Sequence, residues 1–495
     1  MKQARLMLSH PPVAPFAGSI EITNAILAEV LSDLGYETSS FYKLRPQARD
    51  IAEWVPLGAA GVVLRLQAGG DPDVEIRDNT SLDLFPPPRR GAHKNALVFH
   101  ALFSRGEQWI GNEAIDGYWG NSAYMSRVVL SFLSLPSWRR GSLLDPRAFS
   151  LVGTVTLPLP LLAKPEVLIE GGTAELPDAA LAALDGDDVL GHCVTHKIDE
   201  RATYAILLAL NQIALQSGIR RRFRLFVDGY LYDNLKRALA DESGDRMPPE
   251  FRPLKAVLAQ LGLSIDDILI PTPHLAQSAL FKIVDACHFG LQYHWLPEPF
   301  GLFPLESVCH GCPVYTNGNG NLRHLLPAGH GIEVLESEAM AFGDLAAYAA
   351  VAQRIFHDTV VDPAPAREAC RRGAELIAKT YTREALRRDL AARLAALSEP
   401  AEEHDLASAR VVLGPMVRRF DPETRRVVSD YKNVELSPDQ ARLVQEAVGQ
   451  TCGDLAHDRD GAEMELVDGL FQQGILAAFP PGGFSGEPVA EASGG

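Results

Sequence analysis

The chain has 495 residues, of which 46% are hydrophobic and 22% charged, and its formal net charge is −17 at pH 7. This length predicts about three domains, and the negative charge argues against nucleic acid and anionic membrane surfaces as main partners. Cysteines are sparse, and the sequence has neither an apolar signal segment nor a run of 18 apolar residues, so we expect a cytoplasmic protein without a membrane span.

The first 165 residues predict an α/β domain. Apolar runs bounded by turn residues and helical patterns predict strands at 5–10, 36–41, 59–66 and 96–100, a helix over 19–34, and a strand followed by a helix around 114–124. His100 ends one of these strands, and ligands bind at the carboxyl ends of strands in open parallel sheets. This histidine either contacts a ligand or only serves the strand end structurally.

A proline-, glycine- and aspartate-rich region around 157–188 predicts the connection to a second domain, which we place at 185–397. Strands and helices alternate in this domain: strands are expected from 189 and at 223–228, 267–271 and 313–316, and helices at 201–216, from 231, and at 254–263, 280–286, 302–310, 364–380 and 383–397. This alternation predicts a doubly wound parallel sheet.

The stretch 281–334 holds two glutamates, Glu298 and Glu306, on either side of a loop that enters a helix. A helix N-terminus offers N–H groups and a partial positive charge to a phosphate group. A carboxylate one or two turns into the helix can accept hydrogen bonds from a ribose diol, and one in the preceding loop can hold sugar hydroxyls. The alternative is a surface helix with two solvated glutamates.

The amino-acid sequence of this stretch resembles the E-x7-E region of retaining GT-B glycosyltransferases of the family-4 type. The resemblance rests on four segments: Glu298-Pro299-Phe300-Gly301-Leu302, Leu305-Glu306-Ser307-Val308, Gly311-Cys312-Pro313-Val314 and Gly318-Asn319-Gly320. It implies an α/β GT-B fold, with two Rossmann-like domains facing across a cleft. It also implies transfer of a sugar, with retention, from a nucleotide-sugar (a UDP- or GDP-sugar) without an essential metal or other cofactor.

The same resemblance implies roles for individual residues. Glu298 would hold the donor sugar, His100 would touch it from the other domain, and Lys197 would neutralise the leaving diphosphate. The remaining donor-binding candidates are Glu306 on the ribose, His192 and Arg201 near the phosphates, the loop Phe300, Gly301 and Leu302, the pair Gly18 and Ser19, and Thr272 near the base.

One of these positions departs from the family pattern. His192 stands where the family has arginine, five residues before Lys197, and an imidazole is a weaker and pH-dependent phosphate partner. A sugar-nucleotide binding protein with weakened catalysis therefore remains an alternative. A nicotinamide oxidoreductase ranks lower, because no Gly-x-Gly-x-x-Gly turn follows the first strand or the strand from 189.

A third domain is predicted at 408–480, after an acidic, proline-broken linker at 398–405. Short strands are expected at 410–413, 417–420, 426–430 and 434–436, helices at 437–449, from 454 and at 462–473, and a strand from 475. This α+β pattern is similar to winged-helix domains of the PqqD-like peptide-recognition type, which implies a peptide or protein acceptor. A packing or homodimerisation domain is the alternative, as is an acceptor that is a small molecule or glycan. Residues 481–495 predict a disordered tail.

Overall fold

The computed structural model describes residues 2–8, 19–42, 72–79, 91, 93–100, 114–139, 149–150, 155–156, 173–194, 199–240, 252–335, 345–398, 403–404, 406–431, 433–457, 459 and 461–479. The strand expected at 59–66 and the tail at 481–495 lie outside these residues. None of the helices described has the length and apolar character needed to span a membrane.

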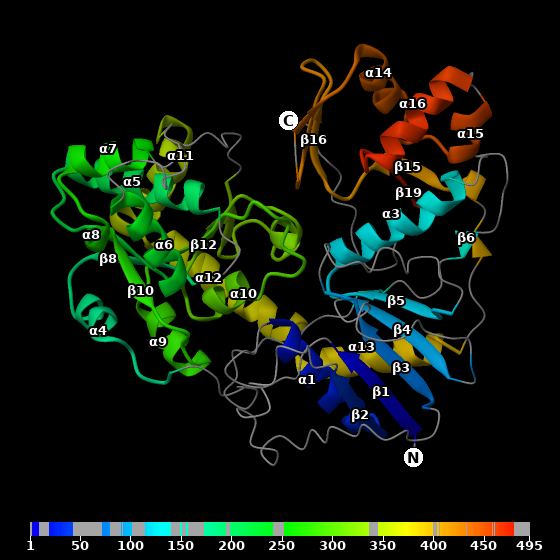
Figure 1. Ribbon diagram of the computed structural model, residues 1–495, viewed down its shortest axis with the longest axis horizontal. Coiled ribbons are helices and arrows are strands. Elements are labelled where there is room, and N and C mark those ends of the chain that lie inside the picture. The colour runs from blue at the N-terminus through cyan, green and yellow to red at the C-terminus, as the bar shows by residue number, and fades with distance from the viewer. Residues whose placement is uncertain are drawn as a thin grey trace. The chain divides into compact units, whose positions relative to one another are not determined.

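The N-terminal part contributes a six-stranded sheet in the order β2-β1-β3-β4-β5-β7. Its strands are β1 (Lys2–Leu8), β2 (Tyr36–Tyr42), β3 (Val74–Asp78), β4 (Lys94–Phe99), β5 (Gly117–Gly120) and β7 (Val155–Thr156), with helices α1 (Ser19–Asp33) and α3 (Ala123–Arg139) (Figure 1). The β1–β2, β3–β4, β4–β5 and β5–β7 pairs are parallel. The strands expected at 36–41 and 96–100, the helix over 19–34 and the strand and helix around 114–124 are confirmed; β1 begins and ends earlier than expected.

Strand β3 is an element that the apolar pattern did not predict. Its sequence Val-Glu-Ile-Arg-Asp alternates apolar and charged residues, yet all five are buried. Arg77 donates to Glu75 Oε1 from Nε at 2.8 Å and from Nη2 at 2.5 Å. Burying these two charges is possible because each neutralises the other. That pairing belongs to the folded strand, and the sequence signal was limited to the alternation of Val74 and Ile76 with charged residues.

The second sheet also has six parallel strands, in the order β10-β9-β8-β11-β12-β13. The strands are β8 (Val189–Cys193), β9 (Phe223–Asp228), β10 (Leu269–Thr272), β11 (Phe289–Gln292), β12 (Val314–Thr316) and β13 (Ile332–Val334). The helices are α4 (Asp178–Leu184), α5 (Glu200–Gln216), α6 (Gly229–Ala240), α7 (Arg252–Leu261), α8 (Ile265–Ile268), α9 (Gln277–Ala286), α10 (Leu302–Cys309), α11 (Leu345–Phe356), α12 (Ala364–Thr380) and α13 (Arg383–Ala396). The predicted doubly wound parallel sheet is confirmed.

Helix α5 forms the centre of the core of this domain. Asp199 caps it by accepting from the N–H groups of Arg201 and Ala202. Its buried apolar residues pack with Phe223 of β9, Phe289 of β11 and Ile355 of α11 in one hydrophobic cluster. Burial of this many apolar side chains is the main force that holds helix and sheet together.

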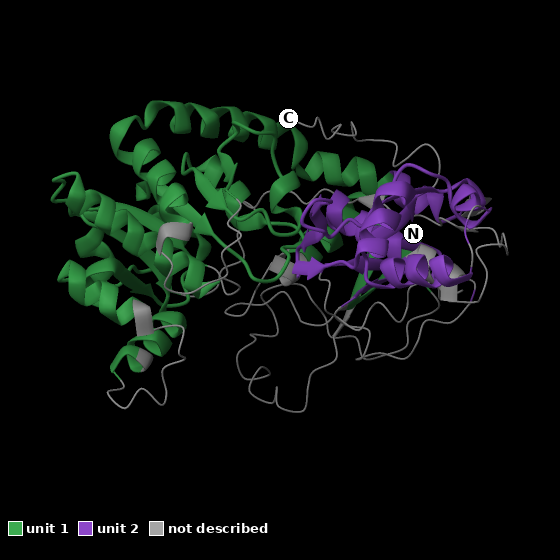
Figure 2. Ribbon diagram, turned by 90° about the horizontal axis from the view of Figure 1, so that it is seen from above, with its two compact units in different colours: residues 1–73, 157–391 green, residues 74–156, 392–495 purple. Residues whose placement is uncertain are grey.

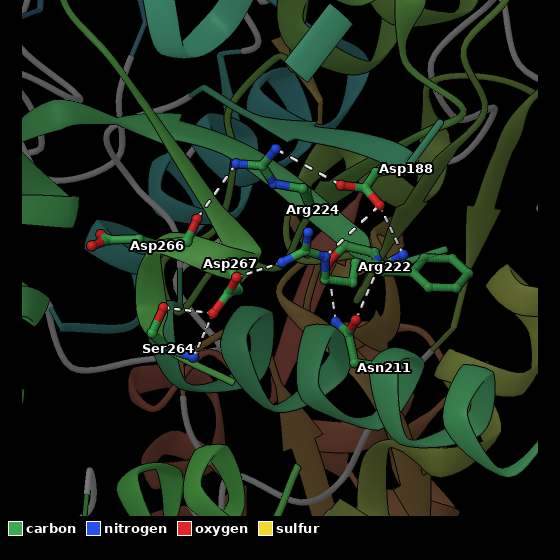
Figure 3. A network of polar contacts seen from close by, with 8 residues as sticks. Asp188, Asn211, Arg222, Arg224, Ser264, Asp266 and Asp267 are labelled. Carbon is green, nitrogen blue, oxygen red and sulfur yellow. Dashed lines mark hydrogen bonds and ion pairs between the residues drawn. The ribbon is translucent and has the colours of Figure 1, made fainter. Parts of the chain in front are cut away.

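A network of charged and polar side chains lies at the amino-terminal edge of the second sheet. Figure 3 shows a network built from Asp188, Asn211, Arg222, Arg224, Ser264, Asp266 and Asp267. Asp188 accepts from the Arg222 N–H at 3.0 Å and lies 3.8 Å from Arg224, while Asp267 accepts from the Arg222 side chain and from Ser264. These charged groups bond to one another and to backbone, so they connect β8, β9 and α8 rather than form a ligand site.

The chain divides into two compact units, residues 1–73 with 157–391 and residues 74–156 with 392–495 (Figure 2). The first unit contains the second sheet together with β1, α1 and β2. Within this unit, helix α13 returns to α1, where Arg383 pairs with Glu29 and Asp33 at 2.7 Å each. The second unit contains β3, β4, β5, β7 and α3 together with the C-terminal segment.

The C-terminal segment has the strands and helices that its sequence predicts. They are β15 (Arg410–Leu413), β16 (Val417–Asp421), β17 (Arg426–Ser429), β18 (Asn433–Glu435), α14 (Pro438–Ala447), α15 (Cys452–His457), α16 (Gly461–Gln472) and β19 (Leu476–Phe479). Strands β16, β17 and β18 form one antiparallel sheet, and β15 pairs antiparallel with β19. Before them, β14 (Glu403–His404) pairs with β6 (Phe149–Ser150).

This segment shares a core with helix α3 inside the second unit. Leu130 of α3 belongs to the same buried cluster as the apolar residues of α14, α16 and β19. Tyr124, also on α3, donates to Asp430 Oδ2 at 2.7 Å, and Arg418 donates to Asp430 Oδ1 at 3.0 Å. The Asp430 side chain is fully buried. The C-terminal segment is therefore built into the second unit through α3.

We expect Asp430→Ala to destabilise the second unit by about 3 kcal/mol, because it removes the buried acceptor of both a hydroxyl and a guanidinium group. Urea unfolding, with hydrogen exchange of α3 as the local probe, measures the loss. Glu435→Ala is the matched control, since that carboxylate is 76% exposed and 3.5 Å from Arg425, and exposed pairs contribute less than about 1 kcal/mol. Equal losses in the two variants would contradict the structural role of Asp430.

Candidate functional site

The carboxyl edge of the second sheet is lined with buried polar side chains. His192 is the penultimate residue of β8, Thr272 ends β10, Gln292 ends β11 and Thr316 ends β12, and each is at most 2% exposed. Thr272 Oγ1 donates to Val227 O at 2.9 Å, and Thr316 Oγ1 donates to Gln292 O at 2.7 Å. The two threonine hydroxyls therefore connect neighbouring strands at the edge where ligands bind in this class of sheet.

Two loops at this edge are joined by amide side chains. Asn317 Nδ2 and Asn319 Nδ2 donate to His294 O at 2.7 and 3.1 Å, and Asn321 Nδ2 donates to Phe300 O at 2.7 Å. The loop after β11 is thus held by the loop after β12 at two points. Side-chain bonds to backbone of this kind replace the ladder that irregular segments lack.

Glu298 lies between those two points, and its backbone is fixed as well. Its N–H donates to Asn319 O at 3.3 Å, and its carbonyl accepts from the Asn321 N–H at 2.8 Å. Gly320 makes the close approach possible: its φ is +69°, and a Cβ there would lie 2.5 Å from both N and O of Glu298. The Glu298 side chain is 18% exposed, and its Oε2 lies 3.5 Å from His294 Nδ1.

Gly301 starts helix α10. It adopts φ +101°, a conformation that favours glycine, and a Cβ there would lie 2.8 Å from Leu325 Cδ1, so the leucine side chain would have to shift. Phe300 is buried against the edge of the Tyr381 ring, with centroids 5.7 Å apart, while Leu302 is partly buried. The N–H groups of the first turn of α10 have no acceptor within the helix and can bind an anion.

Glu306 lies on α10 and is partly buried. Its Oε1 accepts from Gln277 Nε2, at the start of α9, at 3.1 Å. Burial raises the pKa of Glu306 to about 7, and the Gln277 hydrogen bond acts in the opposite direction. A carboxylate whose charge is poorly solvated is suited to accept further hydrogen bonds from a ligand.

His192 is buried under α10 rather than exposed to solvent. Its Nε2 lies 3.2 Å from Ser307 Oγ, and its ring centroid is 4.7 Å from that of Phe303. Burial, followed by the charge of His310, lowers the pKa of His192 to about 3. The ring is therefore neutral at physiological pH. Its Nδ1 has no hydrogen-bond partner among the residues that the structure describes.

Arg201 lies in the first turn of α5, at the same edge of the sheet. The start of this helix is held there because the N–H of its capping residue, Asp199, donates to the carbonyl of Tyr293, directly after β11. The Arg201 side chain is 40% exposed, with Nε 3.4 Å from Asp199 Oδ1. Lys197 and Gly18 lie outside the described residues, and Ser19 is described only as the first residue of α1. The structure thus brings Glu298, Glu306, His192, Arg201, Thr272 and the loop Phe300–Leu302 to one region of the first unit.

His100 belongs to the second unit, where it follows β4. Its N–H donates to Asn79 Oδ1 at 2.9 Å, and its carbonyl accepts from Asn121 Nδ2 at 3.4 Å. Burial lowers the pKa of His100, while the charge of Asp78 acts in the opposite direction. Its Nε2 has no hydrogen-bond partner within the described part of the chain.

Several residues of the site were not among the predicted candidates, including Gln277, Gln292 and His294. His294 follows β11, which the apolar pattern did not predict, so the strand-end signal that singled out His100 was not present for it. Asn319 stood in a segment of the resemblance, Gly318-Asn319-Gly320, without a role of its own. Gln277 follows no strand, and only the packing of α9 beside α10 brings it to Glu306. Among the described residues, no group of three or more metal-ligating side chains could hold a metal ion.

Comparison with known proteins defines the fold. No family model matches the sequence, and no curated protein does. Among solved structures, the chain is similar to Anabaena HepE in complex with UDP and glucose (TM-score 0.51, 14% identity, covering 80% of this chain and 100% of that one). It is also similar to the N-terminal domain of Candida albicans trehalose-6-phosphate phosphatase (TM-score 0.51, 10% identity, covering 80% and 97%). The chain has the α/β GT-B fold. At these identities the likeness concerns the fold alone.

The close approach at Gly320 predicts a specific defect. Gly320→Ala places a methyl group 2.5 Å from the Glu298 backbone in a conformation that favours glycine, so we expect a loss of at least about 3 kcal/mol in unfolding free energy. We also expect faster hydrogen exchange at 293–299. Gly311→Ala is the control: its φ is +76°, but a Cβ there meets nothing within 4 Å, so it loses only about 1 kcal/mol. Similar losses of unfolding free energy in the two variants would contradict the role of the close approach at Gly320.

The raised pKa of Glu306 predicts a pH-dependent stability. Because the folded value of about 7 lies above the unfolded value of 4.5, the native state keeps a proton in this window that the unfolded chain has lost. Stability from this group is therefore complete below about pH 4.5 and falls as pH rises to about 7. Glu306→Gln should match wild type at pH 4 and exceed it by up to about 3 kcal/mol at pH 8. A pH-independent difference in urea unfolding would contradict this assignment.

Proposed function

We propose that this protein is a glycosyltransferase that moves a sugar from a UDP- or GDP-sugar to an acceptor, with retention and without an essential metal ion. The observation that supports it best is the pair Glu298 and Glu306 on either side of the glycine that starts α10, in a GT-B fold. A fixed loop carboxylate, a helix N-terminus and a partly buried helix carboxylate are the groups needed for a sugar, a diphosphate and a ribose.

The donor site follows from this arrangement. Glu306 accepts hydrogen bonds from the ribose diol, and the first turn of α10 binds the diphosphate. Lys197 and Arg201 supply positive charge, with the Gly18–Ser19 loop completing the phosphate side and Thr272 near the base. The complex of Anabaena HepE with UDP and glucose supports a UDP-sugar as the first donor to test.

In the proposed reaction, the bond between the anomeric carbon and the phosphate oxygen breaks, and its electron pair leaves with the diphosphate. The acceptor oxygen bonds to the same face of that carbon, and its proton passes to the departing phosphate oxygen. Lys197 and the N–H groups of α10 stabilise the developing charge. The N–H groups are fixed by the helix and need no reorganisation. Glu298 holds hydroxyls of the sugar, and we assign His100 a second contact with it.

For the acceptor we propose a peptide or protein in the cytoplasm, recognised by the C-terminal segment as a winged-helix domain. Its three-stranded sheet has β16 and β18 as edge strands, and an extended peptide can add to such an edge. A glycan or small-molecule acceptor, or use of this segment in a homodimer, is the competing assignment. Mixing the chain with candidate peptides and with sugars, and following sugar transfer by mass, separates these acceptors.

A second candidate function is supported by His192. In this position the resembled enzymes have an arginine, whereas here the ring is buried and neutral. A chain that binds sugar nucleotides without turning them over is consistent with that loss of charge. Tight binding of a nucleotide-sugar, with no hydrolysis or transfer over hours, would favour this alternative over the enzyme.

The first experiment is a thermal-shift screen with UDP, GDP, ADP, TDP and CDP and their sugar conjugates. A ligand at 100 times its Kd stabilises the folded state by about 2.7 kcal/mol, which gives a clear shift. We expect UDP or GDP and their conjugates to respond. No response to any nucleotide would refute both the donor site and the glycosyltransferase assignment.

Glu306→Gln should weaken the binding of the responding nucleotide-sugar about tenfold or more, since an amide cannot replace a charged acceptor of two hydrogen bonds. Because the pKa of Glu306 is about 7, wild-type affinity should rise about tenfold from pH 6 to pH 8, and the variant should lose this dependence. Calorimetry with the sugar conjugate suits this test, as its diphosphate diester does not titrate in this range. Unchanged affinity would rule out the ribose role.

A further inference from the structure

Three polar side chains lie next to one another in the order Gln292, His294 and Glu298. Gln292 ends β11 and is 2% exposed, and His294 is 1% exposed. The backbone of His294 is fixed on both sides, since its N–H donates to Asn317 Oδ1 at 3.4 Å and its carbonyl accepts from Asn317 and Asn319. The imidazole therefore has a defined position beside the glutamate.

The contacts of the ring indicate which nitrogen carries the proton. Gln292 Nε2 lies 3.3 Å from His294 Nε2. An amide nitrogen can only donate, so with the amide oriented this way Nε2 is the acceptor and Nδ1 carries the hydrogen. The His294 Nδ1 atom lies 3.5 Å from Glu298 Oε2. At this distance the pair is an electrostatic contact between the ring and the carboxylate, and it does not meet the geometry of a hydrogen bond.

We propose that His294 is a positioning residue for Glu298: its Nδ1–H attracts the carboxylate oxygen that lies 3.5 Å away, while Gln292 keeps the ring in the required tautomer. This inference rests on the proposed function, in which Glu298 holds hydroxyls of the donor sugar. A positively polarised N–H beside one carboxylate oxygen restricts rotation of the carboxylate. The effect is specific to the sugar, because Glu298 has no role with the nucleotide.

Two substitutions separate the proposed contact from simple packing. In His294→Asn the amide nitrogen takes the place of Nδ1 and can still donate to Glu298. In His294→Gln the amide reaches the place of Nε2 instead, so the donor toward Glu298 is lost although more of the ring volume is filled. A purely structural role favours the larger glutamine, whereas the proposed role favours asparagine.

The experiment measures by calorimetry the Kd of the nucleoside diphosphate that wild type binds and the Kd of its hexose conjugates. The Kd of the nucleoside diphosphate divided by the Kd of a hexose conjugate gives the contribution of the sugar to binding. We expect His294→Gln to reduce that ratio about tenfold, because it removes the donor that lies 3.5 Å from Glu298 Oε2, with the Kd of the nucleoside diphosphate unchanged. His294→Asn should stay within about threefold of wild type. In a Glu298→Gln background, His294→Gln should cause no further loss.

The outcomes are distinguishable. If wild type binds no nucleotide, the proposed function fails and the inference fails with it. If no hexose conjugate binds more tightly than the nucleoside diphosphate, or if His294→Gln keeps the full sugar contribution, the role of His294 is overturned while the nucleotide site stands. Equal losses in the asparagine and glutamine variants, or additive losses with Glu298→Gln, would also overturn it.

Discussion

The fixed backbone of Glu298 is the constraint on which the candidate site depends. Its N–H and carbonyl bond to the loop after β12, whose glycine at 320 lets the two backbones meet. A loop without regular structure can place a carboxylate reproducibly only if its backbone groups are satisfied in this way. Asn317 and Asn319 extend the same control to His294, so the loops after β11 and β12 behave as one structural element.

In the candidate site, burial shifts the pKa values of ionisable side chains away from the values usual for their residue types. Two side chains on or under α10 illustrate it: Glu306 has its pKa raised to about 7, and His192 has its pKa lowered to about 3. In both cases the poorly solvated environment favours the neutral form. A ligand that supplies hydrogen-bond donors to Glu306 would restore its charge, which couples binding to proton release.

The second unit shows a different principle, in which segments distant in sequence make one core. Leu130 of α3 is buried with the C-terminal helices, and Tyr124 and Arg418 share the carboxylate of Asp430. The C-terminal segment is therefore continuous with the part of the fold that carries His100.

The sequence by itself determined the parallel α/β architecture, the helix that begins after Gly301 and the two glutamates, because periodicity, turn residues and glycine requirements are local. It could not predict β3, whose buried Glu75–Arg77 pair looks polar in sequence, nor that His192 would lie under α10 beside Ser307 and Phe303. Only the tertiary structure decided these features, since the burial of a charge depends on the partner that folding brings to it.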